Sequence, residues 1–168
     1  MTATHPITDH VIQESIAKAV QNVCATMMRH DAVFEQRIAA DSAEAHGQRW
    51  QVIGNVGFVG DANGIVYLCL SEDFALFAAT TILGMSKAEV EFEGDAVLKD
   101  VIGEITNMSV GGFKNQLCDL GFPCKLTLPT IVRGQNLAVA SIKAATRHIF
   151  QFSCSGHRLV ADIQIRAD

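Results

Sequence analysis

Three polar residues recur at helical spacing in the middle of the chain, where they could act together in a chemical step. They are Asp100, Glu104 and Asn107, and Gly111 follows one turn later. At about 100° per residue, the four positions fall within an arc of roughly 60° on an α-helix. A carboxylate can accept a charge-assisted hydrogen bond, and a carboxamide can hold and orient a water molecule. This polar stripe is therefore the main candidate for a functional site.

The helix that carries the stripe is expected over residues 95–120, because Gly121 and Pro123 end it. The apolar side chains on a neighbouring arc would seat it on a core, and they are Val97, Leu98, Val101, Ile102, Ile105 and Met108. On spacing alone, the stripe could be only the solvated side of an amphipathic helix. However, Asn is a poor helix former, and Gly111 and Gly112 each cost about 1 kcal/mol of helix stability. A helix with such costs on one edge often has a partner that approaches closely there, so we expect both glycines to face that partner.

Other kinds of site are not supported. The chain has no phosphate-binding loop, no G-x-S-x-G, no H-E-x-x-H and no G-x-G-x-x-G motif. Its six histidines lack the spacing of metal ligands, and its five cysteines include no C-x-x-C pair. We therefore expect no metal site and no cofactor bound by the chain itself, and we expect the cysteines to be reduced core residues.

The rest of the chain alternates between helical and strand patterns. We expect helices from Thr8 to Met28 and from Ser71 to Leu83, a charged connector at 87–93, and strands within 33–40, 48–70, 125–133, 147–154 and 158–166. The strand at 158–166 alternates apolar and polar residues, which predicts one buried and one solvated face. The fold class is thus α+β, with an antiparallel sheet and packed helices in a single domain over residues 1–168.

Composition limits the class of partner. Of the 168 residues, 49% are hydrophobic and 18% are charged, with a net charge of −5 and no cluster of Lys or Arg. We therefore do not expect this protein to bind nucleic acid. Glycines interrupt the apolar run from Val52 to Leu70, so it cannot span a membrane. The N-terminus lacks the pattern of a secretory signal, and we expect a cytoplasmic protein.

The stripe resembles the CheC/CheX/FliY family of chemotaxis phosphatases. The resemblance rests on the D-x-x-x-E-x-x-N pattern of Asp100, Glu104 and Asn107, on Gly111, and on a later Leu-Pro-Thr strand at residues 128–130. The order of elements is similar to that of CheX across most of the chain. CheC-type members usually carry two such helices, whereas this sequence has one E-x-x-N, as CheX does. The E-x-x-N pattern alone is weak, and its place before the Leu-Pro-Thr strand gives it specificity.

The resemblance implies a phosphatase that acts on phosphorylated CheY or a related receiver domain. Asn107 would position the hydrolytic water, and Glu104 would accept the receiver's lysine. Asp100 and Gly111 would belong to the contact surface, with Asp100 either touching the receiver or supporting local geometry. The receiver's own acidic residues would hold Mg²⁺. The resemblance also implies a homodimer, for which the expected contacts lie at sheet edges within residues 125–133 and 147–166.

Two other interpretations stay open at this point. The chain could be a non-catalytic adaptor or flagellar-switch component that docks on a receiver without hydrolysis, although the presence of both Glu104 and Asn107 counts against it. It could also be a structural domain whose helix is merely solvated. The sequence does not specify which receiver is the partner, or whether the pathway is chemotaxis or another two-component system.

Overall fold

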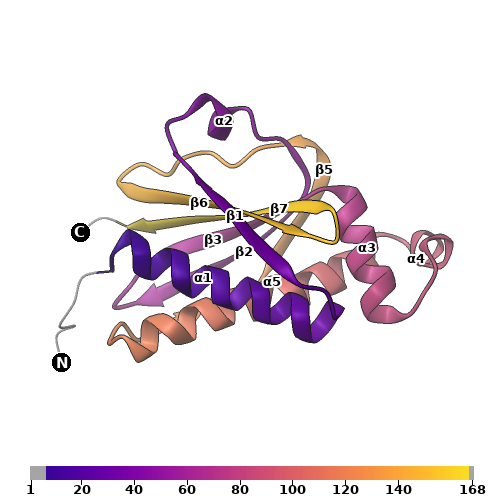
Figure 1. The fold of residues 1–168 in the computed structure, drawn as a ribbon, viewed down its shortest axis with the longest axis horizontal. Coiled ribbons are helices and arrows are strands. Elements are labelled where there is room, and N and C mark those ends of the chain that lie inside the picture. Colours follow the sequence, from indigo (N-terminus) through magenta and orange to yellow (C-terminus); the bar gives the residue numbers. More distant parts are fainter. Residues whose placement is uncertain (1–6, 167–168) are drawn as a thin grey trace.

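The structure, a computed structural model, describes residues 7–166 as an α+β fold, which confirms the predicted class (Figure 1). The helices are α1 (Asp9–Val23), the π-helical η1 (Cys24–Met28), α2 (Ala43–His46), α3 (Glu72–Leu83), α4 (Lys87–Glu93) and α5 (Asp95–Asp119). The strands are β1 (Ala32–Ile38), β2 (Trp50–Gly60), β3 (Gly64–Leu70), β4 (Cys124–Leu126), β5 (Thr130–Leu137), β6 (Ala145–Cys154) and β7 (His157–Arg166).

The strands form one antiparallel sheet in the order β1-β6-β7-β3-β2-β4, and β5 also pairs with β2. One edge of β2 therefore holds both β4, opposite residues 58–60, and β5, opposite residues 50–55. Strands β6 and β7 have neighbours on both sides. The expectation of a sheet edge within residues 147–166 is therefore wrong, because that segment lies in the sheet interior.

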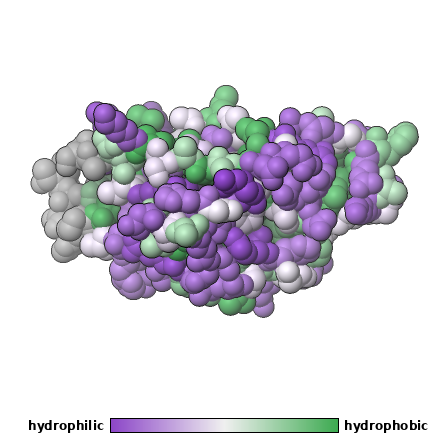
Figure 2. All heavy atoms as spheres, turned by 90° about the horizontal axis from the view of Figure 1, so that it is seen from above, coloured by the Kyte–Doolittle hydropathy of each residue, from purple (hydrophilic) through white to green (hydrophobic). Residues whose placement is uncertain are grey.

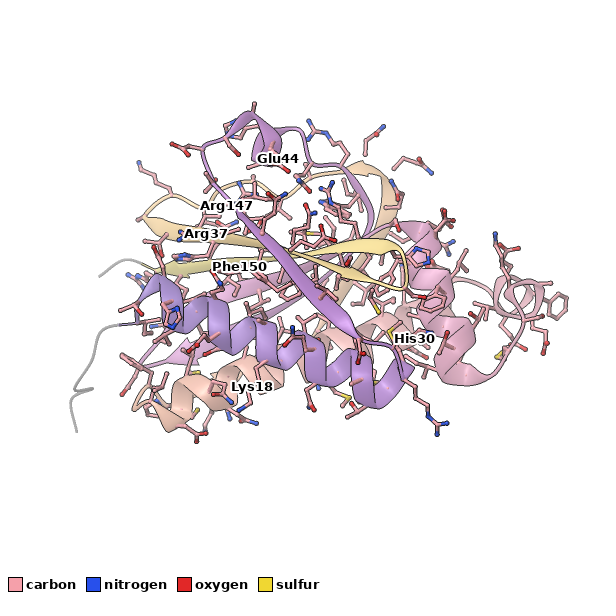
Figure 3. The ribbon with its side chains drawn as sticks, viewed as in Figure 1. Lys18, His30, Arg37, Glu44, Arg147 and Phe150 are labelled. Carbon is pink, nitrogen blue, oxygen red and sulfur yellow. The ribbon has the colours of Figure 1, made fainter. Side chains whose placement is uncertain are left out.

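Helices α1 and α5 lie side by side on one face of the sheet, and α2 lies on the opposite face (Figure 1). The main core lies between the sheet and the helices α1, α3 and α5. A smaller cluster on the α2 side contains Trp50, Ile53 and Ile149. Along β6, Phe150 therefore faces α1 while Arg147 faces the opposite side (Figure 3). Figure 2 views the molecule from above, which is the side on which α2 lies in Figure 1, and most of this face is hydrophilic.

Local capping explains where the helices begin and end. The hydroxyl of Thr8 accepts a hydrogen bond from the Val11 N–H at 3.2 Å, and that of Ser71 accepts one from the Phe74 N–H at 3.1 Å. Gly84 closes α3 with a left-handed φ of 66°, a conformation that favours glycine. These ends agree with those predicted from the sequence.

Two predicted elements were wrong. The charged connector at 87–93 is helix α4, because Ser86 and Glu89 form a reciprocal capping box with distances of 3.1 and 3.2 Å. The single strand expected at 125–133 is split into β4 and β5. Proline has no N–H for a ladder, and Pro129 lies in the loop between the two strands.

Strand β7 was expected to have a solvated face, yet Asp162 and Gln164 are buried. The reason is that β7 is a central strand whose second face is covered by the cluster on the α2 side. Asp162 pairs there with Arg147 at 2.7 Å, and the exposed fractions of the two side chains are 3% and 8%. Arg147 also donates to the Val139 carbonyl at 3.1 Å, so the guanidinium joins the sheet to the covering loop.

We predict that Asp162→Ala lowers the free energy of unfolding by about 3 to 5 kcal/mol, because it leaves the buried Arg147 charge without its partner. Urea denaturation followed by circular dichroism measures the loss. The double variant Arg147→Met/Asp162→Leu should recover most of it, since it removes both charges. A loss in Asp162→Ala below about 1 kcal/mol, as for surface pairs, would contradict a buried pair.

Candidate functional site

The polar stripe lies on the solvent side of α5. Asp100, Glu104 and Asn107 are all exposed, and Gly111 is half-exposed. Within residues 7–166, none of the three polar side chains makes a hydrogen bond or an ion pair with the rest of the chain. The structure thus brings the predicted site residues together on one surface and leaves their polar atoms available to a partner.

Close packing against β2 fixes the rotation of α5. Gly54 faces the buried Thr106, and a Cβ atom at position 54 would overlap the Thr106 side chain. The Thr106 hydroxyl donates to the Ile102 carbonyl at 2.6 Å, so its polarity is satisfied within the helix. About two turns further along, Phe113 meets Phe58 edge to face, with ring centroids 5.8 Å apart. Because this side of α5 is held on the sheet, the stripe must face outwards.

An ion-pair cluster anchors the beginning of α5. Arg133 on β5 pairs with Asp95 at 3.1 Å and also with Glu72 at the start of α3. Lys99 pairs with Asp95 at 2.8 Å. Hydrogen bonds from Lys99 and, to a smaller extent, from Arg133 hold the pKa of Asp95 below its usual range. The hydrogen bond that Arg133 donates to Glu72 raises the pKa of Arg133. The cluster joins α3, α5 and β5 one turn before the stripe begins.

The adjacent glycines Gly111 and Gly112 of α5 differ in their surroundings. A Cβ atom at Gly111 would have Leu126 Cδ1 as its nearest neighbour, at 4.0 Å, which is an ordinary contact. A Cβ atom at Gly112 would lie 3.0 Å from the Cβ of Ala19 on α1. The expectation that both glycines face a partner is therefore wrong for Gly112, which allows close packing of α1 on α5.

Sequence reasoning also misplaced one apolar neighbour of the stripe. Met108 was expected in the buried arc, but 37% of its surface is exposed. Two polar residues of the same helix, Thr106 and Ser109, are buried instead. The Thr106 side chain fits against Gly54 of the sheet, and hydrophobicity alone could not indicate this.

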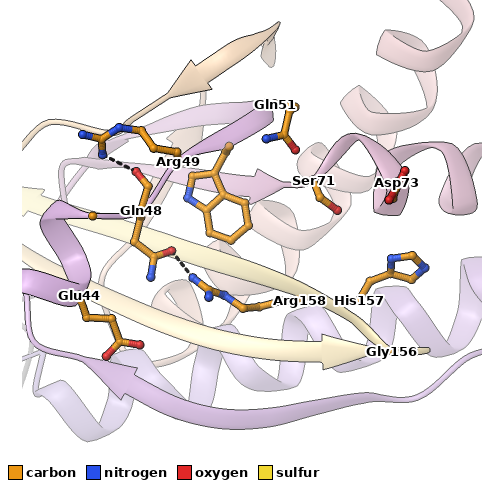
Figure 4. Close-up of a pocket in the computed structure, with 11 residues that line it drawn as sticks. Glu44, Gln48, Arg49, Gln51, Ser71, Asp73, Gly156, His157 and Arg158 are labelled. Atoms are coloured by element: carbon orange, nitrogen blue, oxygen red, sulfur yellow. Dashed lines mark hydrogen bonds between the residues drawn. The ribbon is translucent and has the colours of Figure 1, made fainter.

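A hollow of about 740 Å³ lies elsewhere, on the α2 side of the sheet by the β6–β7 turn (Figure 4). Its lining mixes both signs of charge, including Arg49, Arg158, Glu44 and Asp73. The guanidinium of Arg158 is already engaged, because it lies 5.2 Å from the Trp50 ring centroid and donates to Gln48. This arrangement offers no uniform charge for a ligand, and none of the stripe residues lines it.

The stripe has the convex surface of a helix. Such a surface cannot enclose a small molecule, which binds in concave sites. It can enter a cleft on another protein and deliver a carboxylate and a carboxamide there. Among residues 7–166, no group of three or more His, Cys, Asp or Glu side chains is placed to hold a metal ion. No helix in that part of the chain is long and apolar enough to cross a membrane.

Solved structures define the class of fold. A CheC-like superfamily protein from Shewanella sp. PV-4 superposes with a TM-score of 0.81 at 23% identity, covering 94% of this chain and 98% of its own. The chemotaxis protein CheX from Vibrio vulnificus gives 0.78 at 24% identity, covering 95% and 99%. CheX in a CheX–CheY–BeF₃–Mg²⁺ complex from Borrelia burgdorferi gives 0.74 at 23% identity, covering 92% and 97%. The fold is thus that of the CheC-like proteins.

The sequence itself identifies the family. The family described as "Chemotaxis phosphatase CheX" matches residues 52–153, which is more than half of the chain. The protein therefore belongs to the CheX family, as the stripe and the Leu-Pro-Thr segment suggested. A search of curated proteins finds no significant match.

The adjacent glycines Gly111 and Gly112 give a matched test of the stripe. We predict that Gly111→Leu leaves the melting temperature unchanged or raises it, because Leu is the better helix former and position 111 has space. Gly112→Leu should lower it, since the side chain would have to enter the α1–α5 contact at a cost of about 1 to 3 kcal/mol or more. Differential scanning calorimetry compares them. Equal losses in both variants would mean that position 111 is buried.

Proposed function

We propose that this protein is a phosphatase that hydrolyses the phosphoaspartate of a CheY-like receiver domain, using Asn107 and Glu104. The observation that carries the proposal is the pair of exposed, unpartnered side chains one turn apart on the convex surface of α5. Two comparisons support it: the family is described as a chemotaxis phosphatase, and the B. burgdorferi relative is a complex with CheY, beryllofluoride and Mg²⁺.

The chemistry requires little from this chain. A receiver domain supplies the phosphoaspartate, its Mg²⁺ and a lysine, so hydrolysis chiefly lacks a well-placed water. The Asn107 carboxamide is proposed to hold this water in line with phosphorus, its carbonyl accepting a hydrogen bond from the water. A glutamine has a comparable positioning role in some GTPases. No covalent intermediate forms on this chain.

Glu104 is proposed to fix the register of docking. Its carboxylate would accept a charge-assisted hydrogen bond from the receiver's lysine. The spacing suits this division, because residues three apart on a helix lie on adjacent turns of the same side. Asp100 and Gly111 extend the same surface by one turn at each end, and we propose that both contact the receiver.

We further propose a homodimer that leaves both stripes open. Strand β5 pairs only with β2 along its length, so its other edge is available within the described chain. A second copy could extend the sheet there, because an unpaired edge is a template for another strand. We also propose that the reaction takes place in the cytoplasm, where phosphorylated receivers act.

The test is phosphate release from a panel of phosphorylated receivers of the same genome, with and without the protein. Faster release from at least one receiver supports the proposal. Binding to a receiver without any acceleration would instead indicate an adaptor, and would overturn the catalytic part.

We predict that Asn107→Ala loses the catalytic effect while the fold is kept. Removing one preorganised polar group from an active site costs about 2 to 4 kcal/mol of barrier, or roughly 30-fold to 1000-fold in kcat. Ala is also the better helix former, so stability should not fall. Stopped-flow dephosphorylation measures the rate. Asn115→Ala, an exposed residue two turns along α5, is the matched control and should be unaffected. Wild-type rates in Asn107→Ala would refute the mechanism.

For Glu104→Gln, we expect a higher KM together with a smaller loss of kcat, because the uncharged amide cannot form the ion pair with the receiver's lysine. The contact is solvent-accessible at the rim, which limits the effect to about tenfold. Steady-state kinetics at increasing salt provides the check. Salt should raise the wild-type KM more than that of the variant. Parallel salt dependence in the two proteins would show that Glu104 makes no charge-dependent contact.

A further inference from the structure

The loop between β4 and β5 exposes an aliphatic side chain almost completely. Leu128 is 88% exposed, and the neighbouring Pro129 is exposed as well. An isolated exposed Leu needs no explanation. This one, however, is held beside the polar stripe by contacts on both sides of the loop.

The contacts of the flanking strands place the loop alongside Asn107. Leu126, at the end of β4, is the nearest neighbour of the Cβ position of Gly111, at 4.0 Å. Ile131, in β5, is the nearest neighbour of the Cβ position of Gly103, at 3.8 Å. The loop joins these two points, and Asn107 is halfway between the two glycines on α5. Leu128 and Pro129 therefore border the stripe at the level of Asn107.

The loop is rigid. The Thr127 N–H donates to the Gly57 carbonyl at 2.8 Å, and the Thr127 hydroxyl accepts from the Gly57 N–H at 2.9 Å. Strands β4 and β5 both pair with β2 on either side of the loop, and Pro129 has a fixed φ. Binding through Leu128 thus requires little ordering of the backbone, which lowers the entropic cost of association.

A second apolar side chain, Met108, is 37% exposed on the other side of the stripe. On the α5 helix, the direction of residue 108 differs by about 100° from that of residue 107, away from the side of Gly103 and the loop. Glu104 and Asn107 are therefore flanked by apolar side chains on both sides. Apolar side chains beside polar groups suit a surface that contacts another protein, and Met is enriched in protein interfaces.

We propose that Leu128 and Pro129 form an apolar anchor that docks on the receiver domain beside its phosphorylation cleft. This inference rests on the proposed function and specifies its binding surface. A receiver of about 120 residues has a radius of gyration near 14 Å. Such a body cannot bring its cleft over Asn107 without covering the adjacent loop. The anchor therefore sets affinity, whereas Asn107 sets the rate of hydrolysis.

The experiment uses the receiver that responds in the phosphate-release panel, activated with beryllofluoride and Mg²⁺. Isothermal titration calorimetry measures the Kd of the complex between this activated receiver and the protein. The KM and kcat of dephosphorylation are measured with the phosphorylated receiver as substrate. In Leu128→Ser we expect Kd and KM to rise about tenfold or more, from the loss of a buried Leu, at unchanged kcat and melting temperature. Leu128→Met should keep the wild-type Kd. Val33→Ser is the matched control, because Val33 is 56% exposed on β1 at the opposite edge of the sheet.

The outcomes separate this inference from the proposed function. A wild-type Kd in Leu128→Ser, together with lost turnover in Asn107→Ala, overturns the anchor and leaves the phosphatase in place. A shift of Leu128→Ser from dimer to monomer in analytical ultracentrifugation also overturns it, since the loop would then belong to the dimer contact. A raised Kd in Leu128→Ser with a normal Kd in Asn107→Ala supports the division of roles. If no receiver binds to or is hydrolysed by the wild type, the proposed function itself fails.

Discussion

The contact between α5 and β2 is the constraint on which the site depends. Gly54 admits the side chain of Thr106, and Phe113 packs on Phe58 further along the same helix. These contacts set both the height of α5 over the sheet and its rotation about its own axis. A rotation of one residue, about 100°, would turn the polar stripe towards the core or α1. The orientation of the stripe is thus determined by residues that are themselves buried in the core.

Much of this arrangement was predictable because helical periodicity and caps are local signals. Thr8, Ser71 and Gly84 define helix ends within a few residues of sequence, and the spacing of Asp100, Glu104 and Asn107 defines a common surface. The contacts of residues on the opposite side of the helix could not be predicted in the same way. Whether Gly111 or Gly112 faces α1 depends on where Ala19 arrives, and that is a tertiary relation between segments about 90 residues apart.

The strands were harder to predict because their neighbours decide which faces are buried. The alternation in β7 predicted one solvated face, yet the strand lies between β6 and β3 with both faces covered. Asp162 is tolerated there only because Arg147 neutralises it, and this pairing across two strands has no signature in either segment. The loop with Leu128 and Pro129 divides residues 125–133, which were predicted to form one strand, into β4 and β5.

The absence of internal partners for Asp100, Glu104 and Asn107 has a kinetic consequence. No hydrogen bond or ion pair within the described chain holds these side chains in place, so ordering each of them in a complex would cost about 0.5 to 1.5 kcal/mol. Part of the interaction free energy is therefore used for ordering and is not available as affinity. Such a surface favours short-lived complexes, so that one copy of the protein can contact many partner molecules in succession.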